Sequence, residues 1–188
     1  MAVQGRVQAG ILGGSVIQRF ALSPTAARRP GFDPSLYITL FADASYCPTT
    51  KAYGWCWWIK YDSPAKTEIG VGGGSGLKGS YQAEVEALRA GMAFIRESLP
   101  QAMKGKRIVI QSDCTGALEA IVPDMEQLKR LGAQTAYTKH VKGHRGHSTA
   151  RNSINTLCDK KAREQMLVWR QKAHQAESVL RAKAGLSV

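Results

Sequence analysis

Acidic residues are scarce in this sequence, which has fourteen Asp and Glu against twenty-six Lys and Arg and a formal net charge of +12. Such an excess of positive charge favours a polyanionic partner, and nucleic acid comes before an anionic membrane surface or a merely basic soluble protein. Long apolar runs are also lacking. The longest uncharged run near the N-terminus, residues 7–18, is too short and too rich in glycine to span a bilayer. We therefore expect a nucleic-acid partner and no membrane.

Cysteine is present but forms no metal or disulfide pattern. There is no CxxC pair, and each thiol lies in an apolar or β-rich run, where cysteine behaves as a small hydrophobic residue. The four positions are Cys47, Cys56, Cys114 and Cys158. This usage favours a reducing compartment, and the expected location is the cytoplasm.

The first 35 residues differ in composition from the rest. They carry four arginines, no acid before Asp33, and much Gly, Ser, Ala and Pro. This composition predicts a flexible basic arm at residues 1–35 that lies outside the folded domain. A presequence that targets the chain to an organelle shares this composition and is the alternative.

Apolar and β-rich runs predict the strands. Two of these runs, residues 36–43 and 106–113, end on a carboxylate. An aromatic run at residues 53–61, a turn at residues 62–64 and a returning strand at residues 66–71 complete an antiparallel meander with the first strand. A further strand is predicted at residues 135–141.

Residues 72–79, "GGGSGLKG", are predicted to form a loop. Gly74, Gly76 and Gly79 match the GxGxxG pattern of dinucleotide sites. We discount this match because so much glycine fits many patterns, and because no acid ends a second parallel strand at the required distance.

Helices are predicted from apolar residues that recur at steps of three and four. The stripe over residues 81–99 is the clearest, and it is followed by Pro100. Two short helices are expected at residues 115–121 and 123–131. A long final helix is expected from Ile154 to just before Gly185, with seven Lys and Arg against two Glu from Lys160 onward.

Four acids occupy unusual positions in this acid-poor chain. Asp43 and Asp113 end apolar strands, and the carboxyl ends of strands are where α/β sheets bind ligands. Glu84 falls about 60° from the centre of the apolar stripe of its helix, whereas Glu86 falls about 140° away and faces water. Asp159 adjoins the apolar stripe of the last helix. Ordinary surface acids and helix caps explain any one of these residues, but not all four together.

Carboxylates that share one inward-facing site repel each other and resist ionisation unless a cation joins them. Hard oxygen ligands suit Mg²⁺, with Mn²⁺ as a possible substitute. Two such ions a few ångströms apart are a common device for phosphodiester hydrolysis. The acids therefore predict a two-ion metal site that acts on a phosphodiester.

Four segments together resemble type 1 ribonuclease H. They are "LFADAS" (40–45), "YQAEVEAL" (81–88), "VIQSDCTGAL" (109–118) and "VKGHRGH" (141–147) followed by "LCDKKA" (157–162). The order strand-Asp, helix-Glu, strand-Asp, Gly-His loop, helix-Asp matches that family. The resemblance covers about residues 35–165.

The resemblance implies an α/β fold with a mixed five-stranded sheet, order 3-2-1-4-5, flanked by helices. It implies a catalytic domain at residues 36–165, followed by a basic helical extension at residues 166–188. It also implies an endonuclease that cuts the RNA strand of an RNA/DNA hybrid, leaving 5′-phosphate ends.

The family's pattern also implies a role for each candidate residue. Asp43 would contact both metal ions, and Asp159 would hold the ion that activates the attacking water. Glu84 and Asp113 would hold the ion on the leaving-group side. His144 would assist near the scissile phosphate. Contacts with the nucleic acid are expected from Ser45, Gln82 and Lys142.

Two departures from the family concern substrate binding and the last acid. The short stretch between Asp113 and Lys142 has no room for the additional basic helix of bacterial members, and the C-terminal helix or the N-terminal arm is our hypothesis for a replacement. The chain between His147 and Asp159 is longer than usual, which leaves Glu164 as the alternative acid on that helix.

Three alternatives remain open at this point. A DNA-cutting nuclease of the same fold, such as a junction resolvase, would use the same acids. A non-catalytic nucleic-acid-binding module would need none of them. A zinc protein would use His140, His144, His147 and Cys158, although Gly143 and Gly146 argue against a helix that presents these imidazoles together.

Overall fold

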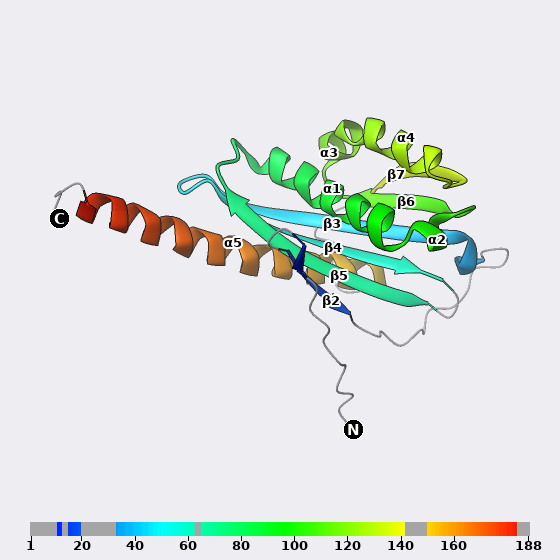
Figure 1. Cartoon of the computed structure of the whole chain (residues 1–188), viewed down its shortest axis with the longest axis horizontal. Coiled ribbons are helices and arrows are strands. Elements are labelled where there is room, and N and C mark those ends of the chain that lie inside the picture. The colour runs from blue at the N-terminus through cyan, green and yellow to red at the C-terminus, as the bar shows by residue number, and fades with distance from the viewer. Residues whose placement is uncertain (1–10, 13–14, 20–32, 63–64, 142–149, 184–188) are drawn as a thin grey trace, which may run out of the picture.

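One mixed sheet organises the part of the chain that the computed structural model describes, residues 11–12, 15–19, 33–62, 65–141 and 150–183. Its seven strands lie side by side in the order β1-β2-β5-β4-β3-β6-β7 (Figure 1). Their bounds are β1 Ile11–Leu12, β2 Ser15–Arg19, β3 Tyr37–Cys47, β4 Ala52–Tyr61, β5 Lys66–Ser75, β6 Arg107–Ser112 and β7 Thr135–His140.

The five strands β3 to β7 form the main part of this sheet. β3, β4 and β5 make an antiparallel meander, and β6 and then β7 join β3 in parallel. Counted in the order of the chain from β3, these strands lie in the order 3-2-1-4-5, which confirms the fold predicted from the sequence. β3 is central and therefore buried on both faces, as its near-continuous apolar run Ile38–Ala42 requires.

The N-terminal segment differs from the predicted arm at the residues the structure describes. β2 pairs antiparallel with β5 from Val16–Val71 to Arg19–Glu68, and β1 pairs with β2. The backbone of β2 thus provides strand partners for the edge N–H and C=O groups of β5, which would otherwise lack them on that side. The rest of residues 1–32 lies outside the described ranges.

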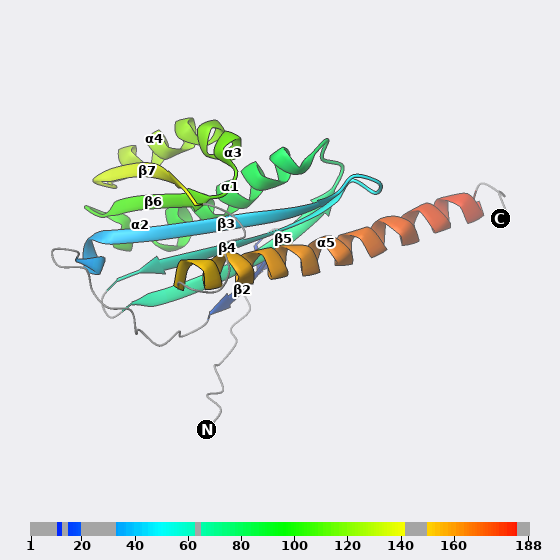
Figure 2. The ribbon, with the colours of Figure 1, turned by 180° about the vertical axis from the view of Figure 1, so that it is seen from behind.

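Helices cover both faces of the sheet, as Figures 1 and 2 show from opposite sides. A short 3₁₀ turn, η1 (Pro34–Leu36), precedes β3. On one face lie α1 (Ser80–Ser98), α2 (Pro100–Met103), α3 (Thr115–Ala120) and α4 (Val122–Arg130). On the other face lies α5 (Ala150–Lys183), whose outer end projects beyond the sheet. None of the helices in the described ranges carries an apolar stretch long enough to cross a bilayer.

Each face has its own hydrophobic cluster. The larger one joins Ile38 and Leu40 of β3 to Leu88 and Ile95 of α1. The smaller one joins Phe41 and Cys56 of the sheet to Cys158 and Ala162 of α5. The alternation of β3 side chains between the two clusters follows from the two-residue period of a strand.

The predicted apolar stripe of α1 is buried except at its start. Val85, Leu88, Met92 and Ile95 are in the core, whereas Tyr81 is 49 % exposed. Tyr81 lies in the first turn of the helix, and its ring lies beside Gly116 of α3. Pro100 ends α1 as predicted and then occupies the first turn of α2, a position that needs no backbone N–H.

Residues 72–75, three glycines and Ser75, lie in β5, so the predicted loop at residues 72–79 is wrong over its first half. Trp55 of β4 lies across Gly72, and Trp169 of α5 lies against Gly73. A side chain at either position would occupy the space of an indole ring. Glycine is therefore required here by close packing rather than by a turn.

The last helix crosses the predicted boundary between residues 165 and 166 without interruption. Met166 is still buried, whereas nearly every side chain described beyond Trp169 is exposed. The predicted extension is thus the second half of α5, continuous with the half that packs on the sheet.

Candidate metal centre

Asp43 lies where the sheet opens between two parallel strands. The pairing of β3 with β6 ends at Phe41 and Gln111, whereas β3 continues to Cys47 beside β4. Beyond Phe41, therefore, no strand of the described residues adjoins β3 on the side of β6. Asp43 is 8 % exposed in this opening.

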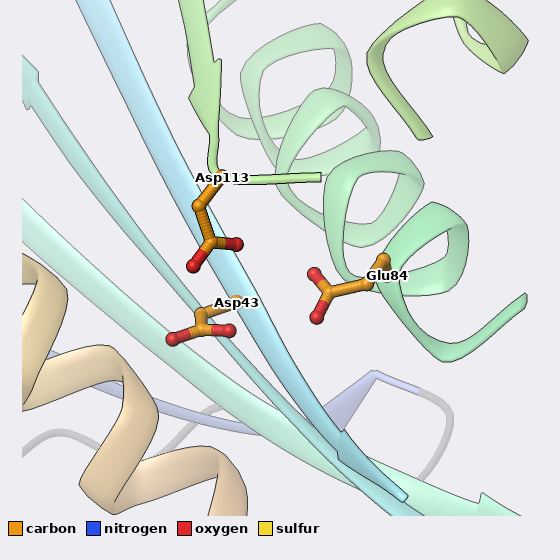
Figure 3. A group of neighbouring side chains, drawn as sticks. All are labelled: Asp43, Glu84 and Asp113. Atoms are coloured by element: carbon orange, nitrogen blue, oxygen red, sulfur yellow. The ribbon is translucent and has the colours of Figure 1, made fainter. Parts of the chain in front are cut away.

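Two further carboxylates reach the same opening from neighbouring elements. Asp113 directly follows β6, and Glu84 lies in the second turn of α1. One oxygen from each of the three carboxylates lies within 4.8 Å of the others. Figure 3 shows the three side chains pointing toward one another. The structure thus brings together three of the four acids predicted from the sequence.

A single backbone amide links two of these acids. The N–H of Ala44 donates to Oδ1 of Asp43 at 2.8 Å and lies 3.3 Å from Oε1 of Glu84. Sequence reasoning missed this donor, because a backbone group carries no residue-type signal. It orients both carboxylates without neutralising either of them.

Asp43 and Glu84 bind protons more tightly than ordinary carboxylic acids. Burial, followed by the charges of Asp113 and Asp159, raises the pKa of Asp43 from 3.8 to about 7. Burial, followed by the charges of Asp43 and Asp113, raises the pKa of Glu84 from 4.5 to about 8. Both shifts express the cost of placing negative charges together in a poorly solvated site.

These residues fit a divalent cation. The donors are hard oxygen atoms, and Oε2 of Glu84 is buried without a hydrogen-bond donor among the residues that the structure describes. A cation would supply the missing partner and would offset the repulsion that raises both pKa values. The arrangement is therefore a candidate site for Mg²⁺ or Mn²⁺.

Asp159 lies near this group but not within it. It is an exposed residue of α5, on the opposite face of the sheet from α1, and its charge reaches Asp43 strongly enough to raise the pKa of that residue. Glu164, the alternative acid, forms an ion pair with Lys161 at 3.0 Å. Of these two acids, Asp159 is the one whose charge acts on the site.

The Gly-His loop lies outside the described residues, and this includes Lys142, His144 and His147. His140, which precedes the loop, ends β7 and is exposed. Its Nε2 lies 3.1 Å from the backbone carbonyl oxygen of Asp113, to which a protonated Nε2 donates. This contact ties the end of β7 to the segment that carries Asp113.

The two other expected nucleic-acid contacts lie on the elements of the site. Ser45 is half-buried on β3, two residues beyond Asp43. Gln82 is exposed in the first turn of α1, where its Oε1 accepts a hydrogen bond from the N–H of Lys78 at 2.7 Å. Gln82 therefore stabilises the start of the helix that carries Glu84.

A pair of buried thiols underlies the site, and sequence reasoning did not bring these two residues together. Cys56 of β4 faces Asp43 in the strand register, and Cys158 directly precedes Asp159. Their sulfur atoms are 3.5 Å apart, and neither side chain is exposed. Cys158 is thus a packing residue between α5 and the sheet, which disfavours the zinc alternative built on it.

Comparison with known proteins places this arrangement among known folds. No protein-family model and no curated protein sequence matches the chain. Among solved structures, the N-terminal ribonuclease H domain of a Mycobacterium tuberculosis protein, solved as a fusion with maltose-binding protein, is similar at a TM-score of 0.51 and 16% identity. The match covers 74% of this chain and 99% of that domain.

Two other solved structures match at lower TM-scores. Ribonuclease H1 from the archaeon Halobacterium salinarum has a TM-score of 0.46 and 15% identity, with 69% of this chain and 97% of that chain covered. LC11 ribonuclease H1, solved in complex with an RNA/DNA hybrid, has a TM-score of 0.48 and 10% identity, with 69% and 96% covered. The likeness to the mycobacterial domain, together with the strand order, shows that the chain has a ribonuclease H-like fold.

Proposed function

We propose that this chain is a divalent-metal-dependent endonuclease that hydrolyses the RNA strand of RNA/DNA hybrids. The observation that carries the proposal is the convergence of Asp43, Glu84 and Asp113 beyond the point where the pairing of β3 with β6 ends, in a ribonuclease H-like fold. The excess of basic residues supports a polyanionic substrate.

The chain's own residues would place the substrate and hold the charges. Asp43 and Glu84, which are oriented by the N–H of Ala44, would present oxygen ligands together with Asp113. Bound divalent cations would supply positive charge at the scissile phosphate and lower the pKa of a bound water. Asp159 would complete the ligand set from the face of α5, and His144 would handle a proton or assist product release near the phosphate.

Recognition of a hybrid would use both of its strands. The RNA strand offers 2′-hydroxyl groups in a wide minor groove, and Ser45 on β3 and Gln82 on α1 flank the carboxylates on either side. Lys142 would contribute positive charge toward a phosphate. The 2′-hydroxyl contacts are the part of this scheme that would separate RNA from DNA.

Cleavage of a labelled hybrid with Mg²⁺ or Mn²⁺ tests the proposal. We expect wild-type protein to cut the RNA strand, and Asp113→Asn or Glu84→Gln to lose at least roughly 10²-fold in rate, because each removes a ligand of a charge-stabilising centre. Glu86→Gln is the matched control, because Glu86 is exposed on the same helix two residues from Glu84 and should keep full activity.

The same assay separates the alternatives. Duplex DNA and a four-way junction are offered beside the hybrid, and preferential cutting of either would identify a DNA nuclease of this fold. A pure binding module would bind nucleic acid, cut nothing, and show no dependence on Mg²⁺. Failure of the wild-type protein to cut the hybrid overturns the proposed activity.

A further inference from the structure

A second concave surface lies away from the carboxylates. It is an open groove of about 930 Å³ between the turn that joins β3 to β4 and the outer half of α5. Figure 2 shows this turn and the projecting helix on the same side of the molecule. Most of its polar lining comes from Thr49, Thr50, Arg170, Gln171, His174 and Ser178.

The lining of this groove is rich in hydrogen-bond donors and contains no carboxylate. On α5 the lining residues recur at steps of three and four, so a single face of the helix presents them. The two alkyl side chains in the groove, Leu167 and Val179, are 42% and 53% exposed. A ligand with negative charge, hydroxyl or amide groups and some apolar surface fits this composition.

The turn that joins β3 to β4, which lines one side of the groove, favours a negatively charged ligand. The hydroxyl and N–H of Thr50, the N–H of Thr49 and the charge of Arg170 all act on the sulfur of Cys47 and lower the pKa of its thiol. These donors therefore converge on one point of the turn, as in a backbone site for an anion. The exposed Lys51 adds positive charge in the neighbourhood.

The two elements that line the groove, β3 with its turn and α5, also carry acids at or near the candidate metal centre. β3 carries Asp43 and, four residues later, Cys47, which is about 13 Å further along an extended strand. α5 carries Asp159 and, eleven residues later, Arg170, which is about 16 Å further along a helix. At about 3.4 Å per phosphate, a strand lying on the carboxylates would reach the groove after roughly four or five nucleotides.

We propose that this groove binds the backbone of the nucleic-acid strand that leaves the cleavage site, as a second contact surface of the same nuclease. The inference rests on the proposed function and adds to it a region of the substrate. Arg170 would contact a phosphate, Gln171 and His174 would donate to phosphate or sugar oxygens, and the turn at Thr49 and Thr50 would close the other side. A single protein thus contacts its substrate at the bond that breaks and at a flank.

Binding of a hybrid with one fixed cleavage point tests this inference. One strand is DNA except for a few ribonucleotides at that point, and affinity is measured in EDTA so that nothing is cut. In a second hybrid, neutral methylphosphonate linkages replace the phosphates about four to six nucleotides to one side of that point. Hybrids with the neutral linkages on the opposite side or in the other strand show which flank lies in the groove.

The protein variants are chosen so that loss of a groove contact is distinguished from loss of general positive charge. The double variant Arg170→Ala, His174→Ala should bind the fully charged hybrid about tenfold more weakly. The number of ions released on binding, given by the slope of log K against log salt concentration, should fall by about one. Lys172→Ala removes an exposed charge that lies over Trp169, outside the groove lining, and should have a much smaller effect. Arg170→Lys should restore most of the affinity.

The groove and the substrate flank are in contact if the losses of affinity caused by the protein variant and by the neutral linkages do not add. If the groove holds this flank, the neutral linkages weaken the wild-type complex about tenfold and leave the Arg170→Ala, His174→Ala complex nearly unchanged. Additive losses, or an equal loss for Lys172→Ala, overturn the inference, and binding of a protein partner or a second copy would then be the use of the groove. If the wild-type protein cuts the hybrid but the losses are additive, only the role of the groove is refuted. If the wild-type protein does not cut the hybrid, the proposed function is refuted.

Discussion

Asp43 shows how one position combines a structural and a chemical requirement. Its strand pairs with β6 as far as Phe41, and Asp43 is buried just beyond that point, where no strand in the described part of the chain adjoins β3 on the β6 side. Glu84 and Asp113 fill this space from the other directions. Burial and mutual repulsion keep Asp43 and Glu84 partly protonated at neutral pH unless a cation is bound, so proton release and metal binding are coupled here.

This coupling predicts a pH-dependent metal affinity. With pKa values of about 7 for Asp43 and about 8 for Glu84, both acids are partly protonated at pH 7. Binding of Mg²⁺ should displace between one and two protons there, and the affinity should rise up to about pH 9 and then level off. Isothermal titration calorimetry in buffers of different ionisation enthalpy counts the protons. Heats that are identical in every buffer would contradict the coupling.

The same shifts predict how stability changes with pH in metal-free protein. A carboxyl whose pKa rises on folding stabilises the fold fully below its unfolded pKa, near 4, and that contribution is lost as pH rises through 7 to 8. Glu84→Gln should therefore be more stable than wild type at pH 8 in EDTA, by roughly 2–4 kcal/mol, and nearly equal to it at pH 4. Urea denaturation at the two pH values measures the difference, with Glu86→Gln as the unaffected control.

At the scale of elements, the docking of α5 on the sheet depends on glycine. Gly54 of β4 faces the backbone of α5 at Ala162 and Met166, and a Cβ at this position would overlap both. Gly73 of β5 similarly leaves room for the ring of Trp169. The helix therefore lies closer to the sheet than side chains would allow. This close approach sets the position of Asp159 relative to Asp43.

Gly54→Ala tests this close approach. The added methyl group meets helix backbone, which cannot rotate away, so we expect a loss of about 2–3 kcal/mol in the free energy of unfolding. Gly79→Ala is the control, because no atom lies within 4 Å of a Cβ added there, and it should cost at most about 1 kcal/mol as a change of helix N-cap. Urea denaturation measures both variants, and equal losses would show that α5 adjusts to the methyl group.

At the scale of the whole molecule, the two halves of α5 have different tasks. The first half completes the smaller hydrophobic cluster through Cys158 and Ala162. The second half projects beyond the sheet, with its described side chains exposed from His174 onward, and forms one wall of the groove. Stability and substrate binding should therefore separate along one continuous helix.

Truncation of the chain tests this separation. A chain that ends after residue 173 loses only exposed side chains among those described, so its thermal midpoint should change by no more than about 2 °C. A chain that ends after residue 161 loses the buried Ala162 and Met166 and should be destabilised by several kcal/mol, roughly the cost of large core deletions. Thermal denaturation followed by circular dichroism compares the two, and similar midpoints would contradict the division.

Local patterns in the sequence determined the strand that carries Asp43, the strand that precedes Asp113, the helix that carries Glu84, and the long last helix. Apolar runs and periodicity are properties of short segments, which is why these elements were predictable. The predicted end of the first strand at Asp43 was wrong, because β3 pairs with β4 as far as Cys47. Several bounds still differed for physical reasons that are not local. Gly72 and Gly73 lie in β5 rather than in a loop, and indole rings occupy the space above them. Tyr81 begins the apolar stripe but is exposed, and its ring lies beside Gly116 of α3.

Only the tertiary structure decided which of these residues meet. The convergence of three carboxylates requires that the β3–β6 pairing stop at Phe41 and Gln111, and no local pattern encodes where two distant strands part. The pairing of β2 with the edge of β5, the contact of Cys56 with Cys158 and the groove beside Arg170 likewise join segments far apart in the chain. The sequence by itself determined which chemical groups are present and on which elements, because these depend on neighbouring residues. Their distances and their altered pKa values depend on burial and on charges brought from elsewhere in the fold.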